Sequence, residues 1–469
     1  MNHPGRRWFV VCCVQVLLLA GCTAEVPRPP ATAAIPWPGP LACEDTRIGA
    51  AFFSPKLNSS DLPCDDLQKM GITTTFFGAW WGLIEPQPGQ YDWSTIDPPV
   101  DAALACGVKP VIKITSSPGP GQDSTPPIDE EAYTRFVTAL VQHLKGRVSA
   151  YAIENEVNNP RMTWTADTYS RLRAAAYQAV KRADPQARVL DSGLTMQAYL
   201  AARASELAQA GDTEGAVAML QRFQAGMTRK PKNLPATPQE LAKWLDQSTN
   251  ARGVGLIEEL RRHPDTYDAV QLHYLQDAWQ LLPEYASWVR AWFPDKPFEF
   301  WEIGYGWPGE EADQPFTEEG HAAGVIKTLV SALGEGASRV IYEPYWDAAG
   351  PADQPGATQG KVGRGLMTAG GPRLAATALG TMTSQLSDCR RVERLDLGVG
   401  IWAYRITTPR GDVYAVWADE QATVRLPVSA AQATVTDLTG ATTRADPAAL
   451  AVGDSPVFVS VLSNTSIGW

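Results

Sequence analysis

Two apolar runs, far apart in the chain, each carry a carboxylate near their end. The first is 151–157, with the pair Asn155-Glu156, and the second is 298–304, with Glu302. Two carboxyl groups can together break a bond between sugars, because one can protonate the leaving oxygen while the other attacks the anomeric carbon. Cleavage with retention of configuration requires the two groups to lie about 5–5.5 Å apart. These residues therefore favour cleavage of glycosidic bonds, provided that the fold brings the two acids together.

Eight apolar runs of strand length alternate with stretches of helical periodicity. The runs are 48–53, 73–77, 110–115, 150–156, 188–192, 269–274, 298–303 and 339–345. Apolar residues between them recur at three- and four-residue spacing, as in 133–144. This order predicts an α/β fold, a TIM (β/α)8 barrel. A doubly wound open sheet is the alternative, but it would need a glycine-rich phosphate loop after an early strand, and the sequence has none.

The predicted barrel would place both acids at one site, because the carboxyl ends of its strands open into a single mouth. Glu156 ends the fourth predicted strand and Glu302 nearly ends the seventh. Different surroundings on two strands could also separate the pKa values of the two carboxyl groups, as an acid and a nucleophile require.

Four motifs resemble those of clan A glycoside hydrolases, a large group of retaining enzymes built on TIM barrels. They are the Asn-Glu end of the fourth strand, the Glu-Ile-Gly end of the seventh, Glu-Pro-Gln-Pro-Gly-Gln-Tyr-Asp-Trp at 85–93, and Leu-His-Tyr at 272–274. The resemblance covers about residues 45–385. Within the clan, the layout is most similar to family thirty-nine-like glycosidases that act on xylosides, uronides or exopolysaccharides.

The resemblance implies a role for each matching residue. Glu156 becomes the acid/base and Glu302 the nucleophile. Asn155 becomes the partner of the sugar 2-hydroxyl, and His273 or Tyr274 lies near the nucleophile. These roles suit the side chains, because an amide can hold a hydroxyl and a tyrosine hydroxyl can steady a carboxylate.

Three tryptophans and two further acids complete the candidate site. Trp80, Trp307 and Trp346 fall near strand ends, where flat rings could stack on sugar faces. Glu154 stands where many clan members carry an aromatic residue, and it is a rival for the acid role. Glu85 is a weaker candidate, since a salt bridge or a cap in a loop would explain it equally well.

The first residues predict export. Arg6 and Arg7 precede the apolar run 8–20, which Leu-Ala-Gly-Cys22 closes, a pattern typical of a signal segment. This ending resembles the lipobox of bacterial lipoproteins, which implies a lipid on Cys22 and a membrane-anchored protein that faces the periplasm or the cell exterior. An ordinary cleaved signal with an incidental cysteine is the alternative.

The remaining composition divides the chain further. We expect a signal peptide at 1–21, Cys22 and a proline-rich tether at 22–44, the barrel at 45–386 with a helical insertion at 196–264, and a small antiparallel, β-sandwich-like domain at 387–469. The insertion either walls a substrate groove or forms a solvated helical hairpin. The C-terminal domain is expected to pack against the barrel rather than to bind carbohydrate.

Charge and cysteine usage exclude other classes of function. The formal net charge of −11 argues against a nucleic-acid partner, because phosphate contact needs a basic face. The five histidines form no His-x-x-x-His motif and the cysteines form no Cys-x-x-Cys motif, so neither a metal nor another cofactor is expected. In an oxidising compartment, Cys43 and Cys64 could form a disulfide.

The sequence thus predicts a retaining glycoside hydrolase that acts on a polysaccharide or oligosaccharide by double displacement. The alternative is a catalytically silent surface lipoprotein that binds glycan.

Overall fold

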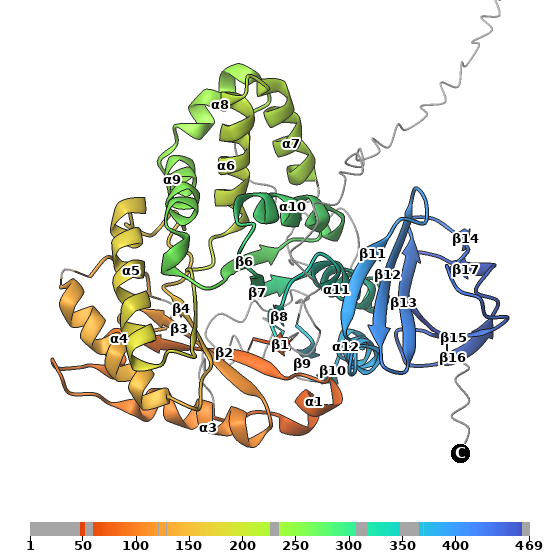
Figure 1. Cartoon of the computed structure of the whole chain (residues 1–469), viewed down its shortest axis with the longest axis horizontal. Coiled ribbons are helices and arrows are strands. Elements are labelled where there is room, and N and C mark those ends of the chain that lie inside the picture. Colours follow the sequence, from red (N-terminus) through yellow and green to blue (C-terminus); the bar gives the residue numbers. More distant parts are fainter. Residues whose placement is uncertain are drawn as a thin grey trace, which may run out of the picture. The chain divides into compact units, whose positions relative to one another are not determined.

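Eight parallel strands form the central sheet of the computed structural model (Figure 1). The structure describes residues 47–51, 60–120, 122–127, 129–225, 234–305, 317–347, 365–368 and 370–461. The strands are β1 Arg47–Ala50, β2 Thr74–Trp80, β3 Lys109–Thr115, β4 Ala150–Ile153, β5 Arg188–Leu190, β6 Val270–Leu275, β7 Phe298–Gly304 and β8 Arg339–Tyr342, and they pair in the order β5-β4-β3-β2-β1-β8-β7-β6. Parallel bridges from Leu190 to Ala269 and from Leu194 to Leu272 join the two outer strands, so the sheet closes into a barrel.

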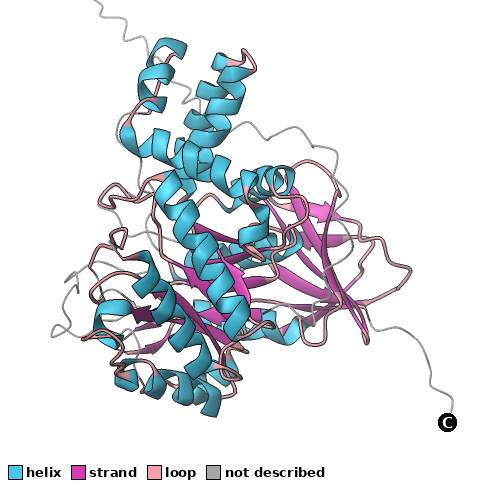
Figure 2. Cartoon of the chain, turned by 60° about the vertical axis from the view of Figure 1, so that its left-hand side comes forward, coloured by secondary structure: helices cyan, strands magenta, loops and turns pink. Residues whose placement is uncertain are grey.

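Helices follow the strands in the order that a TIM barrel requires, and Figure 2 shows helices packed against the strands and a further group of helices that projects beyond them. They are α1 Cys64–Lys69, α2 Trp81–Ile84, α3 Asp97–Ala105, α4 Glu130–Leu144, α5 Ala166–Ala183, α6 Met196–Gln209, α7 Thr213–Ala225, α8 Pro238–Leu245, α9 Ser248–Arg262, α10 Leu282–Trp292, α11 Glu318–Gly334 and α12 Leu374–Gln385. The predicted fold is therefore confirmed. None of the helices within the described ranges combines the length and apolar character needed to span a bilayer.

The predicted insertion between β5 and β6 consists of helices α6 to α9. Thr237 caps the start of helix α8, because its side chain accepts a hydrogen bond from the Glu240 backbone N–H at 3.3 Å, and Pro238 fills the first helical position. The insertion belongs to the same buried core as the barrel, with Tyr199 and Phe223 fully buried.

The C-terminal segment forms antiparallel sheets. Strands β11 Arg391–Leu395, β12 Ile401–Thr408, β13 Gly411–Ala418, β18 Val457–Ser460, β15 Ala433–Thr436 and β16 Thr442–Ala445 pair in that order, and β14 Ala422–Val424 pairs with β17 Leu450–Val452. Alternate side chains of β12 and β13 are buried on opposite faces. Tyr404 donates to Ser331 of α11 at 3.1 Å, whereas Tyr414 packs in a separate core with Val424 and Leu450. One face of this sheet thus packs against the barrel, as expected.

The disulfide prediction was wrong. Cys64, the first residue of α1, is bonded to Cys106, which caps the end of α3, with the two Cα atoms 5.1 Å apart. The bridge joins the helices that follow β1 and β2. These two strands are neighbours in the barrel, although the two cysteines are 42 residues apart in sequence. Cys389 also forms a disulfide. Cys22, Cys43 and the predicted signal and tether lie outside the described residues, so the lipid anchor remains a prediction.

Candidate active site

A tight turn after β4 presents the first acid. The predicted strand 150–156 ends early, at Ile153, and the next three residues leave the sheet. Glu154 and Glu156 both adopt left-handed backbone conformations, with φ values of 67° and 46°. Residues other than glycine rarely adopt this region, and such strain concentrates at functional sites. The turn is closed by a hydrogen bond from the Glu156 N–H to the carbonyl of Ser192, which follows β5, at 2.9 Å.

A bulge in β7 turns the second acid toward the same mouth. Leu272 of β6 pairs with Phe300, but His273 pairs with Glu302, so Trp301 is an extra residue in β7. Strict alternation along β7 would direct Trp301 and Glu302 to opposite faces. Trp301 instead packs in the barrel interior with Phe76, and the bulge allows Glu302 to face inward as well.

The two acids meet beside His273. Its Nδ1 lies 2.9 Å from Glu156 Oε1 and 3.4 Å from Glu302 Oε2, and ligand atoms of all three side chains lie within 4.8 Å of one another. Nδ1 is therefore within reach of both carboxyl groups. The Glu156 side chain is 21% exposed and that of Glu302 is 8% exposed, so the first is open to solvent and the second is enclosed.

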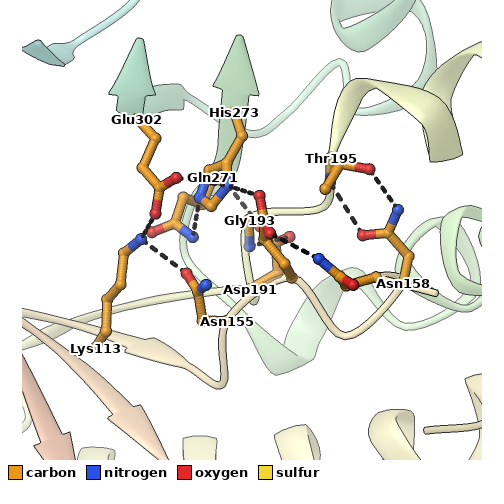
Figure 3. A network of polar contacts seen from close by, with 11 residues as sticks. Lys113, Asn155, Asn158, Asp191, Gly193, Thr195, Gln271, His273 and Glu302 are labelled. Carbon is orange, nitrogen blue, oxygen red and sulfur yellow. Dashed lines mark hydrogen bonds and ion pairs between the residues drawn. The ribbon is translucent and has the colours of Figure 1, made fainter. Parts of the chain in front are cut away.

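Lys113 of β3 supplies the positive charge at the centre of the site. Its ammonium forms a buried ion pair with Glu302 Oε1 and donates to Asn155 Oδ1 at 2.8 Å (Figure 3). The cation also lies 4.2 Å from the centre of the Phe76 ring. Because Lys113 binds the amide oxygen of Asn155, the amide nitrogen is left to donate to a ligand.

The surroundings of Glu302 favour its ionised form. Burial alone would raise the pKa of this carboxyl group. The positive charges of His273 and Lys113, with hydrogen bonds from Lys113 and from Glu343 after β8, instead lower the pKa to about 2. Glu302 is therefore a carboxylate at any physiological pH, as a nucleophile must be.

Gly193 makes room for this arrangement (Figure 3). It has a φ of 64°, and a Cβ atom at this position would lie 2.3 Å from His273 Nε2 and 2.0 Å from Gln271 Nε2. The neighbouring Asp191 accepts hydrogen bonds from the backbone N–H groups of Gln271 at 2.6 Å and Gly193 at 3.3 Å. A glycine after β5 is thus required for the imidazole to reach both acids.

Two candidates from the sequence lie elsewhere. Glu154 is fully buried behind the turn, where Oε1 accepts hydrogen bonds from the Ser116 backbone at 2.9 Å and from the Tyr133 hydroxyl of α4 at 3.1 Å. Tyr274 follows His273 in β6, so its side chain points to the opposite face, where its hydroxyl donates to the Ala278 carbonyl at 2.5 Å. We therefore withdraw Glu154 as a rival acid and Tyr274 as a substrate-binding residue.

The predicted aromatic residues have different positions. Trp80 ends β2 and is 6% exposed, whereas Trp346, after β8, is 36% exposed and packs edge-on against Tyr345. Trp307 lies outside the described residues. Glu85 organises its own loop, accepting hydrogen bonds from the Trp81 indole at 2.5 Å and the Gly89 N–H at 2.6 Å. Of the two predicted tryptophans that the structure describes, Trp346 is the more exposed.

The acids and His273 also have a spacing that could hold a cation. Lys113 already neutralises one oxygen of Glu302, and a divalent ion beside its ammonium would be repelled. The donor set therefore suits proton transfer and nucleophilic attack better than metal binding.

Comparisons with solved structures agree with this fold. A family 39 glycoside hydrolase from Bacteroides cellulosilyticus WH2 is 14% identical with a TM-score of 0.61, and the match covers 90% of this chain and 82% of the other. A GH39 β-xylosidase from Caulobacter crescentus is 16% identical, with a TM-score of 0.57 and coverage of 90% and 97%. A GH30 endoxylanase from Clostridium papyrosolvens C71 is 12% identical, with a TM-score of 0.53 and coverage of 90% and 97%.

The chain shares the fold of clan A glycoside hydrolases. The resemblance to this clan is thus confirmed at the level of the fold. No protein-family model and no curated protein sequence matches the chain.

Sequence reasoning missed three residues of the site, namely Lys113, Glu343 and Gly193. Lys113 had a signal, because it is a charged residue within the otherwise apolar run 110–114. A lysine inside a buried strand needs a partner, and that partner is expected among nearby acids. Glu343 and Gly193 follow the ends of β8 and β5, and only the closed barrel shows that Glu343 adjoins Glu302 and that Gly193 adjoins His273.

Proposed function

We propose that the protein is a retaining glycoside hydrolase. The observation that supports this proposal best is the separation of the acids, since carboxylate oxygens of Glu156 and Glu302 lie within 4.8 Å of each other. Such a close approach of one oxygen from each acid favours double displacement, in which the carboxyl groups lie about 5–5.5 Å apart, over inversion, in which they lie about 6.5–9.5 Å apart. The fold shared with family 39 and family 30 glycoside hydrolases supports it further.

In the proposed reaction, Glu302 attacks the anomeric carbon and forms a glycosyl-enzyme while Glu156 protonates the leaving oxygen. Glu156 then removes a proton from water, which attacks the anomeric carbon and releases Glu302. The more open position of Glu156 suits a group that must meet both leaving group and water. The Asn155 amide, oriented by Lys113, is placed to donate to a hydroxyl of the bound sugar.

Product stereochemistry tests this proposal. We would incubate the protein with xylan, xylo-oligosaccharides and aryl β-xylosides, because two of the similar structures are a β-xylosidase and an endoxylanase. Proton NMR of the first product should show the anomeric configuration of the substrate, and Glu302→Ala should abolish turnover. An inverted first product would contradict double displacement. Binding without turnover across a wider glycan panel would favour the silent glycan-binding alternative.

We also propose that the mature protein is anchored by a lipid on Cys22 and is exposed to the periplasm or the cell exterior, where a polysaccharide would be its partner. The sequence Leu-Ala-Gly-Cys22 after an apolar run supports this. Metabolic labelling with an alkyne fatty acid should mark the wild type but not Cys22→Ser. Equal labelling of the two would contradict the proposal.

A further inference from the structure

The helical insertion contacts the turn that carries Glu156 at two points. Thr195, the residue before α6, and Asn158, two residues after Glu156, exchange hydrogen bonds (Figure 3): the Asn158 amide donates to Thr195 Oγ1 at 2.7 Å, and the Thr195 backbone N–H donates to Asn158 Oδ1 at 3.0 Å. Asn158 is 1% exposed. The first helix of the insertion therefore begins on the loop that follows the acid/base.

The second contact comes from Arg252 on α9. One guanidinium nitrogen donates to the Met162 carbonyl at 2.5 Å, and the other donates to the carbonyls of Asn158 at 3.2 Å and Asn159 at 2.7 Å. These three carbonyls belong to one loop, 158–162. The planar guanidinium can span several acceptors in fixed directions, which a lysine ammonium cannot.

This loop reaches Glu156 directly. The Asn159 backbone N–H donates to the Glu156 carbonyl at 2.7 Å, and its side-chain amide lies 3.4 Å from Glu156 Oε2. Glu156 itself has a φ of 46°, a conformation that persists only where the surroundings hold it. Arg252 binds the carbonyl of the same Asn159, so a single residue lies between the insertion and the acid/base.

Close packing fixes α9 in its position. A Cβ atom on Gly253 would lie 2.9 Å from the Ala198 Cα of α6, and one on Gly255 would lie 3.2 Å from the Ala166 Cβ of α5. Two small residues on α9 thus let its backbone approach the first insertion helix and the helix that follows the Glu156 loop. This geometry argues against a solvated hairpin.

On the basis of the proposed function, we propose that Arg252 is a positioning residue for the acid/base Glu156, and that the insertion holds this half of the active site. The consequence concerns leaving groups. Protonation by Glu156 matters most when the leaving oxygen is strongly basic, so a misplaced Glu156 should slow the cleavage of poor leaving groups and leave good ones nearly unaffected. A general structural defect would slow both equally.

The test compares Arg252→Met with Arg262→Met, a control at the end of the same helix whose exposed guanidinium pairs with Glu259. We expect Arg252→Met to raise the ratio of kcat/KM for 2,4-dinitrophenyl β-xyloside to that for 4-methylphenyl β-xyloside roughly tenfold. The control should keep the wild-type ratio. Arg252→Lys retains the charge without the fork and should restore the ratio only in part. An equal loss on both substrates would overturn the proposal.

Amide hydrogen exchange gives a measurement that does not depend on activity. Peptides that cover 154–163 should exchange faster in Arg252→Met than in the wild type and in Arg262→Met, while peptides of β7 remain unchanged. Unaltered exchange in 154–163 would refute the role of Arg252 even if the enzyme is active. A wild-type protein that cleaves no glycoside would instead refute the proposed hydrolase, and exchange would still decide whether Arg252 holds the loop.

Discussion

Glu302 and Glu156 meet across the mouth of the barrel, but different parts of the chain hold them. Side chains from the barrel strands hold Glu302: the ammonium of Lys113 from β3 and the imidazole of His273 from β6. Glu156 shares His273 with Glu302, but it stands on a left-handed turn, and its remaining contacts come from backbone groups and from Asn159 in the loop after β4. The difference teaches that the nucleophile is fixed by the electrostatics of the barrel, and the acid/base by loop conformation. Variants can break each kind of support separately.

The largest expected effects come from removing either acid, and the two variants should behave differently. Glu302→Ala should remove all turnover, because it removes the carboxylate that forms the glycosyl-enzyme. Glu156→Ala should lower kcat/KM for a poor leaving group roughly 10²- to 10⁴-fold, the contribution of general acid–base catalysis. Added azide should restore turnover of 2,4-dinitrophenyl β-xyloside by Glu156→Ala and yield a glycosyl azide of retained configuration. A retained azide product from Glu302→Ala instead would reverse the two roles.

Removing the ammonium of Lys113 should change the pH at which the nucleophile Glu302 ionises. Glu302 has a pKa of about 2 in the presence of Lys113, so its ionisation does not limit the wild type above that pH. In Lys113→Met, less positive charge opposes the effect of burial, so the pKa of Glu302 should rise. The acidic limb of the pH profile of kcat/KM should therefore move to higher pH by roughly 1–3 pH units. The exposed Lys109 begins the same strand, and Lys109→Met is the matched control. An unchanged acidic limb in Lys113→Met would mean that His273 alone keeps Glu302 ionised.

A smaller effect is expected when a methyl group fills the space beside His273. Gly193→Ala places a methyl group 2.0 Å from Gln271 Nε2 and 2.3 Å from His273 Nε2, so the imidazole must leave its present position beside the two acids. Gly146→Ala is the control, because Gly146 also has a positive φ, 81°, but a Cβ atom there meets nothing within 4 Å. Both variants should lose about 1 kcal/mol of stability from the backbone. Only Gly193→Ala should lose activity, by about tenfold, in initial-rate measurements. Equal activity of the two would exclude a role for the His273 position.

The same contrast explains what the sequence could predict. Glu156 and Glu302 were found because strand periodicity locates β4 and β7 even though β4 ends three residues earlier than predicted, and barrel topology brings the carboxyl ends of the two strands together. The strand alternation that separates His273 from Tyr274 is equally local. The hydrogen bonds from Arg252 to the loop after β4 were not predictable, because they join residues about 90 positions apart in the sequence. The Cys64–Cys106 bridge was missed for the same reason.

The smallest effect concerns Glu154, on the same turn but outside the site. Burial raises the pKa of Glu154 to about 7, although hydrogen bonds from Ser116 and Tyr133 oppose this. Its pKa in the unfolded chain is about 4.3, so the folded state binds the proton more tightly, and the wild type should lose stability as pH rises from about 4 to about 7. Glu154→Gln carries no charge and should avoid this loss, which amounts to about 1–3 kcal/mol at pH 8.

Thermal unfolding of the wild type and Glu154→Gln at pH 4.5 and pH 8 would measure this difference. The midpoints should be similar at the lower pH and diverge at the higher one, with Glu154→Gln the more stable. Glu131→Gln, at a position whose side chain is 92% exposed, should follow the wild type at both values. Because Glu154 faces Tyr133 rather than Glu302, turnover by Glu154→Gln should stay near the wild-type rate. A loss of turnover as large as that of Glu156→Ala would return Glu154 to the acid role and place the catalytic proton on the buried side of the turn.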